Sequence, residues 1–369
     1  MRIKNLNLLN FKNYEEESLE FTEGVNILTG NNGSGKTNLL DAIHFLSMSK
    51  SAFHTSDNQS LKRGESFFSI SGTFNKNNTD YLISTLFQAG KKIFQADKKS
   101  YEKITDHIGR FPLILVTPYD TDLIREGSEE RRKFFDSLFS QIDKSYLISL
   151  IRYNHFLKQR NSLLKQFAEK RYTDFDLLES YDGPLLEEGF KIYAWRKKFT
   201  EEFLPMFNNA YDLLAHRKET VSLTHQSDVA DPEFKVIYKN AVQKDLILER
   251  TTKGIHKDDY QFLIEGQSVK ASGSQGQQKS YVLALKLASF QLLAKYSQTK
   301  PILLLDDIFD KLDEERIISL LKIIDRDDFG QILITEAKLE RSLEYFKNIK
   351  KQIRIFNISK GKILSVQNV

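Results

Sequence analysis

Residues Gly30–Thr37 read GNNGSGKT and match the pattern G-x-x-x-x-G-K-[ST] at every fixed position. The residues before this octapeptide, GVNILT at 24–29, have strand character, and those after it, NLLDAIHFLSM at 38–48, place apolar side chains at helical spacing. A glycine-rich turn that leads into a helix N-terminus directs backbone N–H groups towards a polyphosphate. The stretch therefore predicts an α/β fold with a phosphate loop between a strand and a helix.

The octapeptide also predicts individual contacts to ATP. Lys36 is expected to reach the β- and γ-phosphates, and the Thr37 hydroxyl is expected to bind Mg²⁺. The alternative, a glycine-rich turn with a chance lysine, leaves the strand and helix context unexplained. The other predicted contacts come from the rest of the loop, namely Gly30, Asn31, Asn32, Gly33, Ser34 and Gly35.

Two acids at the end of an apolar run form the second half of the predicted site. Residues 302–307 read ILLLDD, which is typical of a buried parallel strand that ends in carboxylates. Asp306 is expected to complete the Mg²⁺ shell, and Asp307 to orient or deprotonate the attacking water. Asp307 and Lys36 are thus the predicted catalytic residues. A strand that ends in a solvated Asp-Asp turn is the alternative, and it is less expected beside a phosphate loop.

A second polar loop precedes another helical pattern. Residues 273–280 read GSQGQQKS, and YVLALKLASFQLLAKY follows with apolar positions at helical spacing. The N–H groups of such a helix N-terminus, together with the Ser274 hydroxyl, suit the exposed γ-phosphate of a bound nucleotide, with Gly276 and Gln277 in the same loop. One chain cannot readily present both loops to one ATP. We therefore expect a two-fold homodimer that forms on ATP, with two nucleotides at its interface.

The order of these motifs carries a resemblance. GNNGSGKT, SQGQQ, ILLLDD and then KLD at 311–313 resemble the ATPase head of the ABC family, in the branch that includes the SMC proteins and RecF. The resemblance implies an ABC-type P-loop head, a mixed sheet with flanking helices, in which SQGQQ is the signature motif. It also implies that Asp313 is the aspartate of the D-loop and contacts the nucleotide site.

Further segments narrow the resemblance to the RecF family. These are IKNLNLLNFKNYEE at 3–16, TPYDTDLIREGSEERRKFFD at 117–136, RYNHFLKQRNSLLK at 152–165 and GIHKDD at 254–259. The resemblance implies a DNA-binding ATPase of recombinational repair and replication, connected with DNA damage and the SOS response. It implies ATP-driven dimerisation at junctions of single-stranded and double-stranded DNA in gaps, recombinase loading there, and RecR and RecO as partners.

Some positions depart from the family pattern. Ile255, His256 and Lys257 stand where relatives usually have Pro-His-Arg, and Thr335 with Glu336 stands where many ABC ATPases have a switch histidine. Asp307 is shorter than the glutamate of fast ABC ATPases. The missing switch histidine and the shorter Asp307 predict slow hydrolysis, which suits the timed release of a dimer and not a motor.

Most of the chain lies between Lys36 and Asp306, so the sequence predicts a large insert. We expect the N-terminal part of the head at 1–118, a compact and mostly helical lobe at 119–250, and the C-terminal part of the head at 251–369. From Phe135 to Leu164 apolar residues recur every three or four positions, which predicts one long helix. Breaks are expected near 182–184 and 228–232, which contain glycine or proline.

The insert contains a basic stretch at 144–171, where basic residues greatly outnumber the single acid, Glu169. Basic side chains with interspersed aromatics could neutralise DNA phosphates without reading sequence. The alternative is a solvated helix face with its aromatics in the core. The candidate DNA contacts are Arg152, Lys158, Arg160 and Lys165.

Composition bounds the remaining possibilities. The chain has 369 residues, a net charge of +4 and no cysteine, which excludes disulfides and thiolate sites. No apolar segment suits a secretory signal or a membrane span, so a cytoplasmic protein without a membrane partner is expected. The alternatives of another class are a P-loop phosphotransferase for a small molecule, which has no use for SQGQQ, and an SMC-like tether, which needs long heptad arrays.

Overall fold

The structure is a computed structural model that describes residues 1–215, 219–309, 312–337, 344–346 and 349–369. The chain forms two compact units. We call the first the head, which comprises Met1–Thr121, Asn209–Lys218 and Gln275–Val369, and the second the lobe, which comprises Asp122–Asn208 and Glu219–Ser274. The lobe thus ends at 274 rather than at the predicted 250, because the strand that follows residue 258 pairs with a strand of the lobe.

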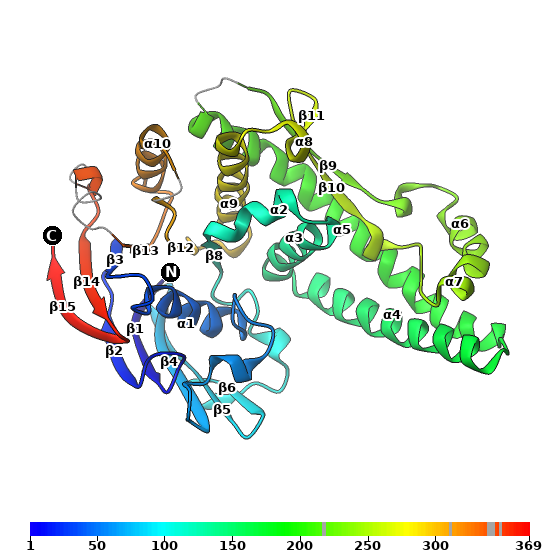
Figure 1. Cartoon of the computed structure of the whole chain (residues 1–369), viewed down its shortest axis with the longest axis horizontal. Helices are drawn as coiled ribbons and strands as arrows, with labels where there is room; N and C mark the ends of the chain where they lie inside the picture. The colour runs from blue at the N-terminus through cyan, green and yellow to red at the C-terminus, as the bar shows by residue number, and fades with distance from the viewer. Residues whose placement is uncertain (216–218, 310–311, 338–343, 347–348) are drawn as a thin grey trace. The chain divides into compact units, whose positions relative to one another are not determined.

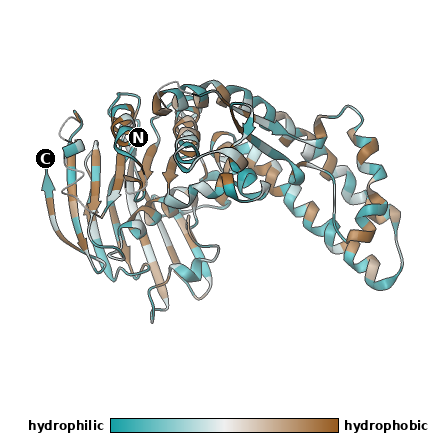
Figure 2. Ribbon diagram, turned by 45° about the horizontal axis from the view of Figure 1, so that its top comes forward, coloured by the Kyte–Doolittle hydropathy of each residue, from teal (hydrophilic) through white to brown (hydrophobic). Residues whose placement is uncertain are grey.

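The head contains a mixed six-stranded sheet in the order β15-β14-β3-β13-β12-β8 (Figure 1). All neighbours are parallel except β14 and β15, and β3, β12 and β13 are buried throughout. Figure 2 shows hydrophobic colouring along strands of the head. The strands are β3 (Val25–Thr29), β8 (Leu113–Val116), β12 (Ile302–Leu305), β13 (Ile332–Glu336), β14 (Ile353–Ser359) and β15 (Lys362–Asn368).

Helices α1, α9 and α10 lie in the head. Their bounds are α1 (Lys36–Met48), α9 (Gln275–Ser297) and α10 (Glu314–Ile324), and short 3₁₀ turns are η1 (Asp57–Ser60), η2 (Ile104–Asp106) and η3 (Pro118–Thr121). Helix α1 buries its apolar residues in one core with both head sheets. The phosphate loop is therefore fixed at both ends, by the central strand β3 and by α1.

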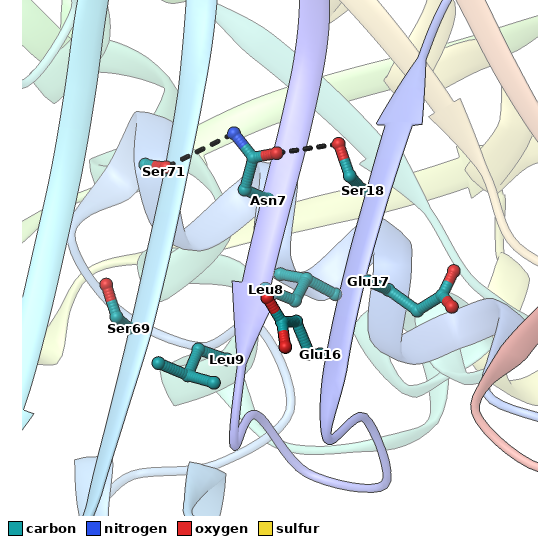
Figure 3. A pocket seen from close by; sticks show the side chains of 8 residues that line it. All are labelled: Asn7, Leu8, Leu9, Glu16, Glu17, Ser18, Ser69 and Ser71. Atoms are coloured by element: carbon teal, nitrogen blue, oxygen red, sulfur yellow. Dashed lines mark hydrogen bonds between the residues drawn. The ribbon is translucent and has the colours of Figure 1, made fainter.

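A second, antiparallel sheet of the head has the order β2-β1-β4-β5-β6-β7. One face enters the core, and the other is polar: Figure 3 shows Ser18, Asn7 and Ser71 in a row across β2, β1 and β4, joined by side-chain hydrogen bonds. The shallow pocket around them contains none of the predicted site residues. The strands are β1 (Arg2–Leu9), β2 (Glu16–Glu20), β4 (Phe67–Lys76), β5 (Thr79–Gln88), β6 (Lys91–Ala96) and β7 (Lys99–Ser100).

The lobe is mostly helical but also contains a three-stranded sheet in the order β11-β10-β9. Its strands are β9 (Val221–Gln226), β10 (Asp259–Ile264) and β11 (Gln267–Ser268). The helices are α2 (Asp122–Arg125), α3 (Ser128–Ile142), α4 (Lys144–Lys170), α5 (Phe175–Ala215), α6 (Phe234–Asn240), α7 (Val242–Leu248) and α8 (Val269–Ser272), with 3₁₀ turns η4 (Asp228–Ala230) and η5 (Ile255–Lys257). The last residues of α5 belong to the head unit.

Two predicted features of the lobe helices are wrong. The single helix expected from Phe135 is interrupted at Asp143, whose side chain accepts hydrogen bonds from the N–H groups of Ser145 and Tyr146 and so caps α4. The break expected near 182–184 is absent, because α5 continues through Pro184. Proline removes one backbone hydrogen bond of α5, but buried side chains that recur every seven residues stabilise the helix. These are Leu178, Leu185, Ile192 and Phe199.

None of the helices within the described ranges combines the length and the apolar character that a bilayer crossing requires.

Candidate nucleotide-binding site

The phosphate loop uses its glycines for backbone geometry. Gly30, Gly33 and Gly35 have φ of 148°, 77° and 116°, in the region that side chains disfavour. At Gly30 a Cβ atom would also lie 2.1 Å from the carbonyl oxygen of Ile358 in β14, so no side chain fits there. The glycines therefore allow the loop to pass close to β14 while it curls into α1.

The loop is braced by residues that the motif does not include. The Asn13 side-chain amide donates to the carbonyl of Ser34 at 3.0 Å, and the N–H of Gly361 donates to the same oxygen at 2.8 Å. The buried Tyr14 hydroxyl donates to the carbonyl of Gly35 at 3.0 Å, and burial raises the pKa of Tyr14, which keeps it a donor. These hydrogen bonds occupy the carbonyls of Ser34 and Gly35 and so fix the backbone at the end of the loop.

Two polar groups of the loop suit an anion. The Lys36 ammonium is buried and donates to the carbonyls of Gly30 and Asn31 at 2.7 and 3.2 Å, so its charge is held within the loop. The Ser34 hydroxyl is buried and has no hydrogen-bond partner among the described residues. A buried hydroxyl without a partner costs free energy, and a phosphate oxygen is an acceptor that would remove this cost. The loop therefore fits a polyphosphate.

The acidic half of the site contacts the loop directly. The Thr37 hydroxyl lies 2.9 and 3.1 Å from the two carboxylate oxygens of Asp306, although the residues are 269 positions apart. Because that hydroxyl donates its hydrogen to Asp306, an oxygen lone pair is left for a metal ion. Burial raises the pKa of the Asp306 carboxyl, with a smaller contribution from the Asp307 charge, while hydrogen bonds from Thr335 and Thr37 oppose the shift.

Thr37 and Asp306 fit the usual coordination of Mg²⁺ at a nucleotide site. Magnesium usually binds through one or two protein oxygens, several waters and the phosphates of the substrate, rather than through a cage of side chains. Within the described residues no group of three or more acids and histidines could hold a metal on its own. Thr37 and Asp306 would thus hold the ion together with the nucleotide.

Asp307 follows Asp306 in an unusual backbone conformation. Its φ is 49°, in the left-handed region, and its N–H donates to the Thr335 hydroxyl at 2.8 Å. The same hydroxyl donates to Asp306 at 2.8 Å, so Thr335 contacts both acids. Thr335 lies in β13, between β3 and β12, and the carboxyl ends of these strands meet at one edge of the sheet. The sheet order therefore brings the loop and the acids together.

The second predicted loop lies at the start of α9. Ser274 is exposed and directly precedes the helix, and Gly276 and Gln277 are in its first turn. Asp313 caps α10 by accepting a hydrogen bond from the N–H of Arg316 at 3.0 Å. Lys311 of the KLD motif lies outside the described residues. The location of Ser274 at a helix N-terminus agrees with the predicted anion contact, which remains a prediction.

The basic stretch divides into exposed and buried residues. Lys158 and Lys165 are exposed on α4, and Arg152 is half exposed and pairs with the buried Glu188 at 3.1 Å. Arg160, in contrast, is fully buried, and its guanidinium pairs with Asp182 at 2.6 Å and Asp245 at 2.7 Å. The prediction of Arg160 as a DNA contact is therefore wrong. Its role is to hold α4, α5 and α7 together.

Replacing Arg160 by methionine is expected to destabilise the lobe by about 3–5 kcal/mol, because the buried Asp245 and the partly buried Asp182 would both lose their cation. Denaturant unfolding of the full chain, followed by fluorescence of the lobe residue Trp195, measures this change. Lys158→Met on the exposed face of α4 is the control and should change stability by less than about 0.5 kcal/mol. Equal stability of both variants would contradict the assigned role of Arg160.

Other family-like segments also pack inside the lobe. Arg131 and Arg132 of the 117–136 segment reach Asp259 and the carbonyl of Asp258, respectively, which belong to the GIHKDD segment. His256 lies between the Tyr153 hydroxyl and the carbonyl of Thr251, and burial lowers its pKa to about 4. A neutral, enclosed histidine is explained by packing. The spacing of these residues in the sequence did not predict that the arginines pair with the GIHKDD segment or that His256 meets Tyr153.

A phosphate loop after β3, paired acids after β12 and a polar loop before α9 define a P-loop ATPase head of the ABC type, as in SMC proteins. The family model for the RecF/RecN/SMC N-terminal domain matches residues 2–110. RecF proteins of Cytophaga hutchinsonii and Flavobacterium johnsoniae are 48% and 43% identical over 98% and 97% of this chain, and over 96% and 100% of their own length. The chain belongs to the RecF family of DNA replication and repair proteins.

Solved structures agree with this assignment. The recombination mediator protein RecF of the RecFOR pathway, solved with ATP, is 30% identical, covers all of this chain and 97% of its own, and has a TM-score of 0.87. An SMC head bound to the C-winged helix domain of ScpA is 14% identical, with a TM-score of 0.59, and shares the fold. The predicted family and fold class are confirmed. Nothing among these relatives supports the phosphotransferase alternative.

Proposed function

We propose that this chain binds ATP with Mg²⁺ and that ATP then joins two copies of it into a homodimer on DNA. The bond between Thr37 and Asp306 carries the proposal, because it assembles the phosphate loop and the metal-binding acid of one site. Family membership and the RecF structure solved with ATP support ATP as the nucleotide that this chain binds. The exposed Ser274 at the start of α9 supports a contact to the nucleotide of a second copy.

The proposed DNA substrate is a gap, where single-stranded and double-stranded DNA meet, and slow hydrolysis would release the dimer. Relatives act in replication and repair, and the RecFOR pathway of a solved relative supports RecR and RecO as partners in recombinase loading. Such work on chromosomal DNA would take place in the cytoplasm. The partners would help the chain act at gaps rather than at a particular sequence, since no base-reading motif is evident.

Light scattering tests the proposal as a whole. The protein should be monomeric alone, dimeric with a non-hydrolysable ATP analogue and Mg²⁺, and bound as a dimer to gapped DNA under the same conditions. A monomer in the presence of saturating nucleotide would overturn the proposed dimer. Binding of gapped DNA that is unchanged by nucleotide would overturn the proposed coupling between ATP and DNA.

Asp307→Asn is expected to bind ATP and form the dimer but to lower turnover at least about a hundredfold, because an amide cannot accept a proton from the attacking water. The near-isosteric side chain keeps the backbone N–H that donates to Thr335. Single-turnover hydrolysis of labelled ATP measures the effect. Turnover equal to that of the unmodified protein would remove Asp307 from the chemistry.

The exposed basic residues of α4, namely Arg152, Lys158 and Lys165, are the proposed DNA contacts. Lys158→Glu combined with Lys165→Glu should weaken DNA binding and reduce the slope of log K against log salt by about 0.9 for each DNA phosphate that the variant no longer neutralises. Fluorescence anisotropy with a gapped duplex at several salt concentrations gives both numbers. The matched control is Lys235→Glu with Lys239→Glu on α6, and an equal loss of affinity in the control would show a nonspecific charge effect.

A further inference from the structure

Arg316 joins two segments of the head that are far apart in the sequence. Its guanidinium forms an ion pair through Nη1 with Asp313, and its Nε donates to the hydroxyl of Ser280 in α9 at 2.6 Å. Ser280 is 1% exposed, so this bond lies inside the head. Asp313 in turn accepts from the backbone N–H of Arg316. One side chain therefore ties the start of α10 to the start of α9.

The same guanidinium lies against the glycine of the second loop. A Cβ atom at Gly276 would be 3.1 Å from Nη2 of Arg316 and 3.4 Å from its Cζ. Gly276 has no left-handed backbone angle, so its conformation alone would accept a side chain. A side chain at Gly276 would therefore require the Arg316 guanidinium to shift by a few tenths of an ångström. The close approach also shows that the guanidinium packs against the first turn of α9.

We propose that Arg316 is a positioning residue for the half-site that one copy offers to the nucleotide of the other. The inference rests on the proposed function, in which Ser274 and Asp313 both act on a partner's site. In this role Arg316 acts through Asp313 and α9 and not by touching the nucleotide itself. It holds Asp313 and the first turns of α9 as one rigid element, so both reach the second copy in a fixed relative position.

Preorganisation explains why Arg316 is expected to strengthen the association of two copies. Two separately mobile segments lose conformational freedom when an interface forms, and this loss weakens association. The Arg316 guanidinium already links the two segments in the monomer through its contacts with Asp313 and Ser280, which removes part of that cost. The contribution should therefore appear in the pairing of two copies and in turnover, and not in the affinity of the monomer for ATP.

Arg316→Met keeps most of the side-chain volume and removes the guanidinium. We expect ATP-driven dimerisation about tenfold to a hundredfold weaker and turnover reduced in parallel, with the affinity of dilute monomer for a fluorescent ATP analogue within about twofold of the unmodified protein. Ser280→Ala removes only one bond and should give a smaller loss of dimerisation. Arg326→Met, an exposed arginine just beyond α10, is the matched control and should dimerise normally.

A double substitution tests the contact itself. Gly276→Ala should weaken dimerisation when Arg316 is present, because the new methyl group displaces the guanidinium, and should have a smaller effect in the Arg316→Met background, which has no guanidinium. Strictly additive effects would overturn the contact. Normal dimerisation of both Arg316→Met and Ser280→Ala, with Ser274→Arg unable to dimerise, would overturn the inference and leave the proposed function intact. Absence of a dimer in the unmodified protein would overturn both.

Discussion

Lys36→Ala is expected to abolish ATP binding at micromolar nucleotide and, with it, ATP-driven dimerisation. The ammonium is the cation held inside the phosphate loop, where it contacts the carbonyls of Gly30 and Asn31. A phosphate oxygen can replace those carbonyls, and a charged hydrogen bond of this kind contributes about 1.5–3 kcal/mol, so affinity should fall about tenfold to a hundredfold or more. Isothermal titration with ATP and Mg²⁺ measures the loss of affinity directly.

Two comparisons keep the Lys36 result interpretable. Lys62→Ala removes a surface lysine that pairs with the exposed Glu15, and this control should bind ATP normally. Thermal unfolding without nucleotide measures how far each variant is destabilised, because Lys36→Ala also removes the donor to two carbonyls of its own loop. A dimer of Lys36→Ala that still depends on ATP would mean that the nucleotide binds elsewhere in the chain.

Ser274→Arg is expected to prevent dimerisation while the monomer binds ATP with unchanged affinity. The residue is exposed at the start of α9, where the helix N-terminus favours an anion. An arginine there would add bulk and a charge at the surface that we expect to meet the γ-phosphate of a second copy. The mass by light scattering with a non-hydrolysable analogue should stay that of a monomer at every protein concentration at which the unmodified chain is dimeric.

A second arginine separates this effect from a general change in charge. Gln298→Arg places the same side chain just beyond the other end of α9, roughly 36 Å away at 1.5 Å per residue, and should leave dimerisation unaffected. Loss of both nucleotide affinity and dimerisation in Ser274→Arg would instead show that the loop acts on the site of its own chain.

Local patterns predicted the parts of the site that are continuous in sequence. The strand, loop and helix around Gly30–Thr37 occur as predicted. Asp306 follows a fully buried strand, because the four apolar side chains of ILLL are stable only away from water, inside the sheet. The pairing of Thr37 with Asp306 followed from their chemistry. In contrast, Asn13 and Gly361 brace the loop from two distant turns. Asn13 lies in the family-like segment at 3–16, but nothing in that segment predicted its contact with the loop.

The errors have physical causes of the same kind. The spacing of apolar residues placed Arg160 on a helix, but burial was decided by Asp182 and Asp245, which come from other helices. Proline usually ends a helix, yet Pro184 is tolerated because the surrounding heptad is buried. The end of the lobe was misplaced because pairing of β9 with β10 is a long-range contact. In each case the structure depends on contacts between residues that are distant in sequence, which a local pattern does not reveal.

The central position of β3 has a consequence for synthesis on the ribosome. Both neighbours of β3 in the sheet, β13 and β14, belong to the last part of the chain, and the Gln331 side chain bonds the backbone of Ile3 across 328 residues. A nascent chain thus emerges with β3 unpaired and apolar, and this strand must wait until translation has nearly finished. The lobe is complete earlier. Premature termination within the last strands would therefore release chains with a folded lobe and an exposed, aggregation-prone β3.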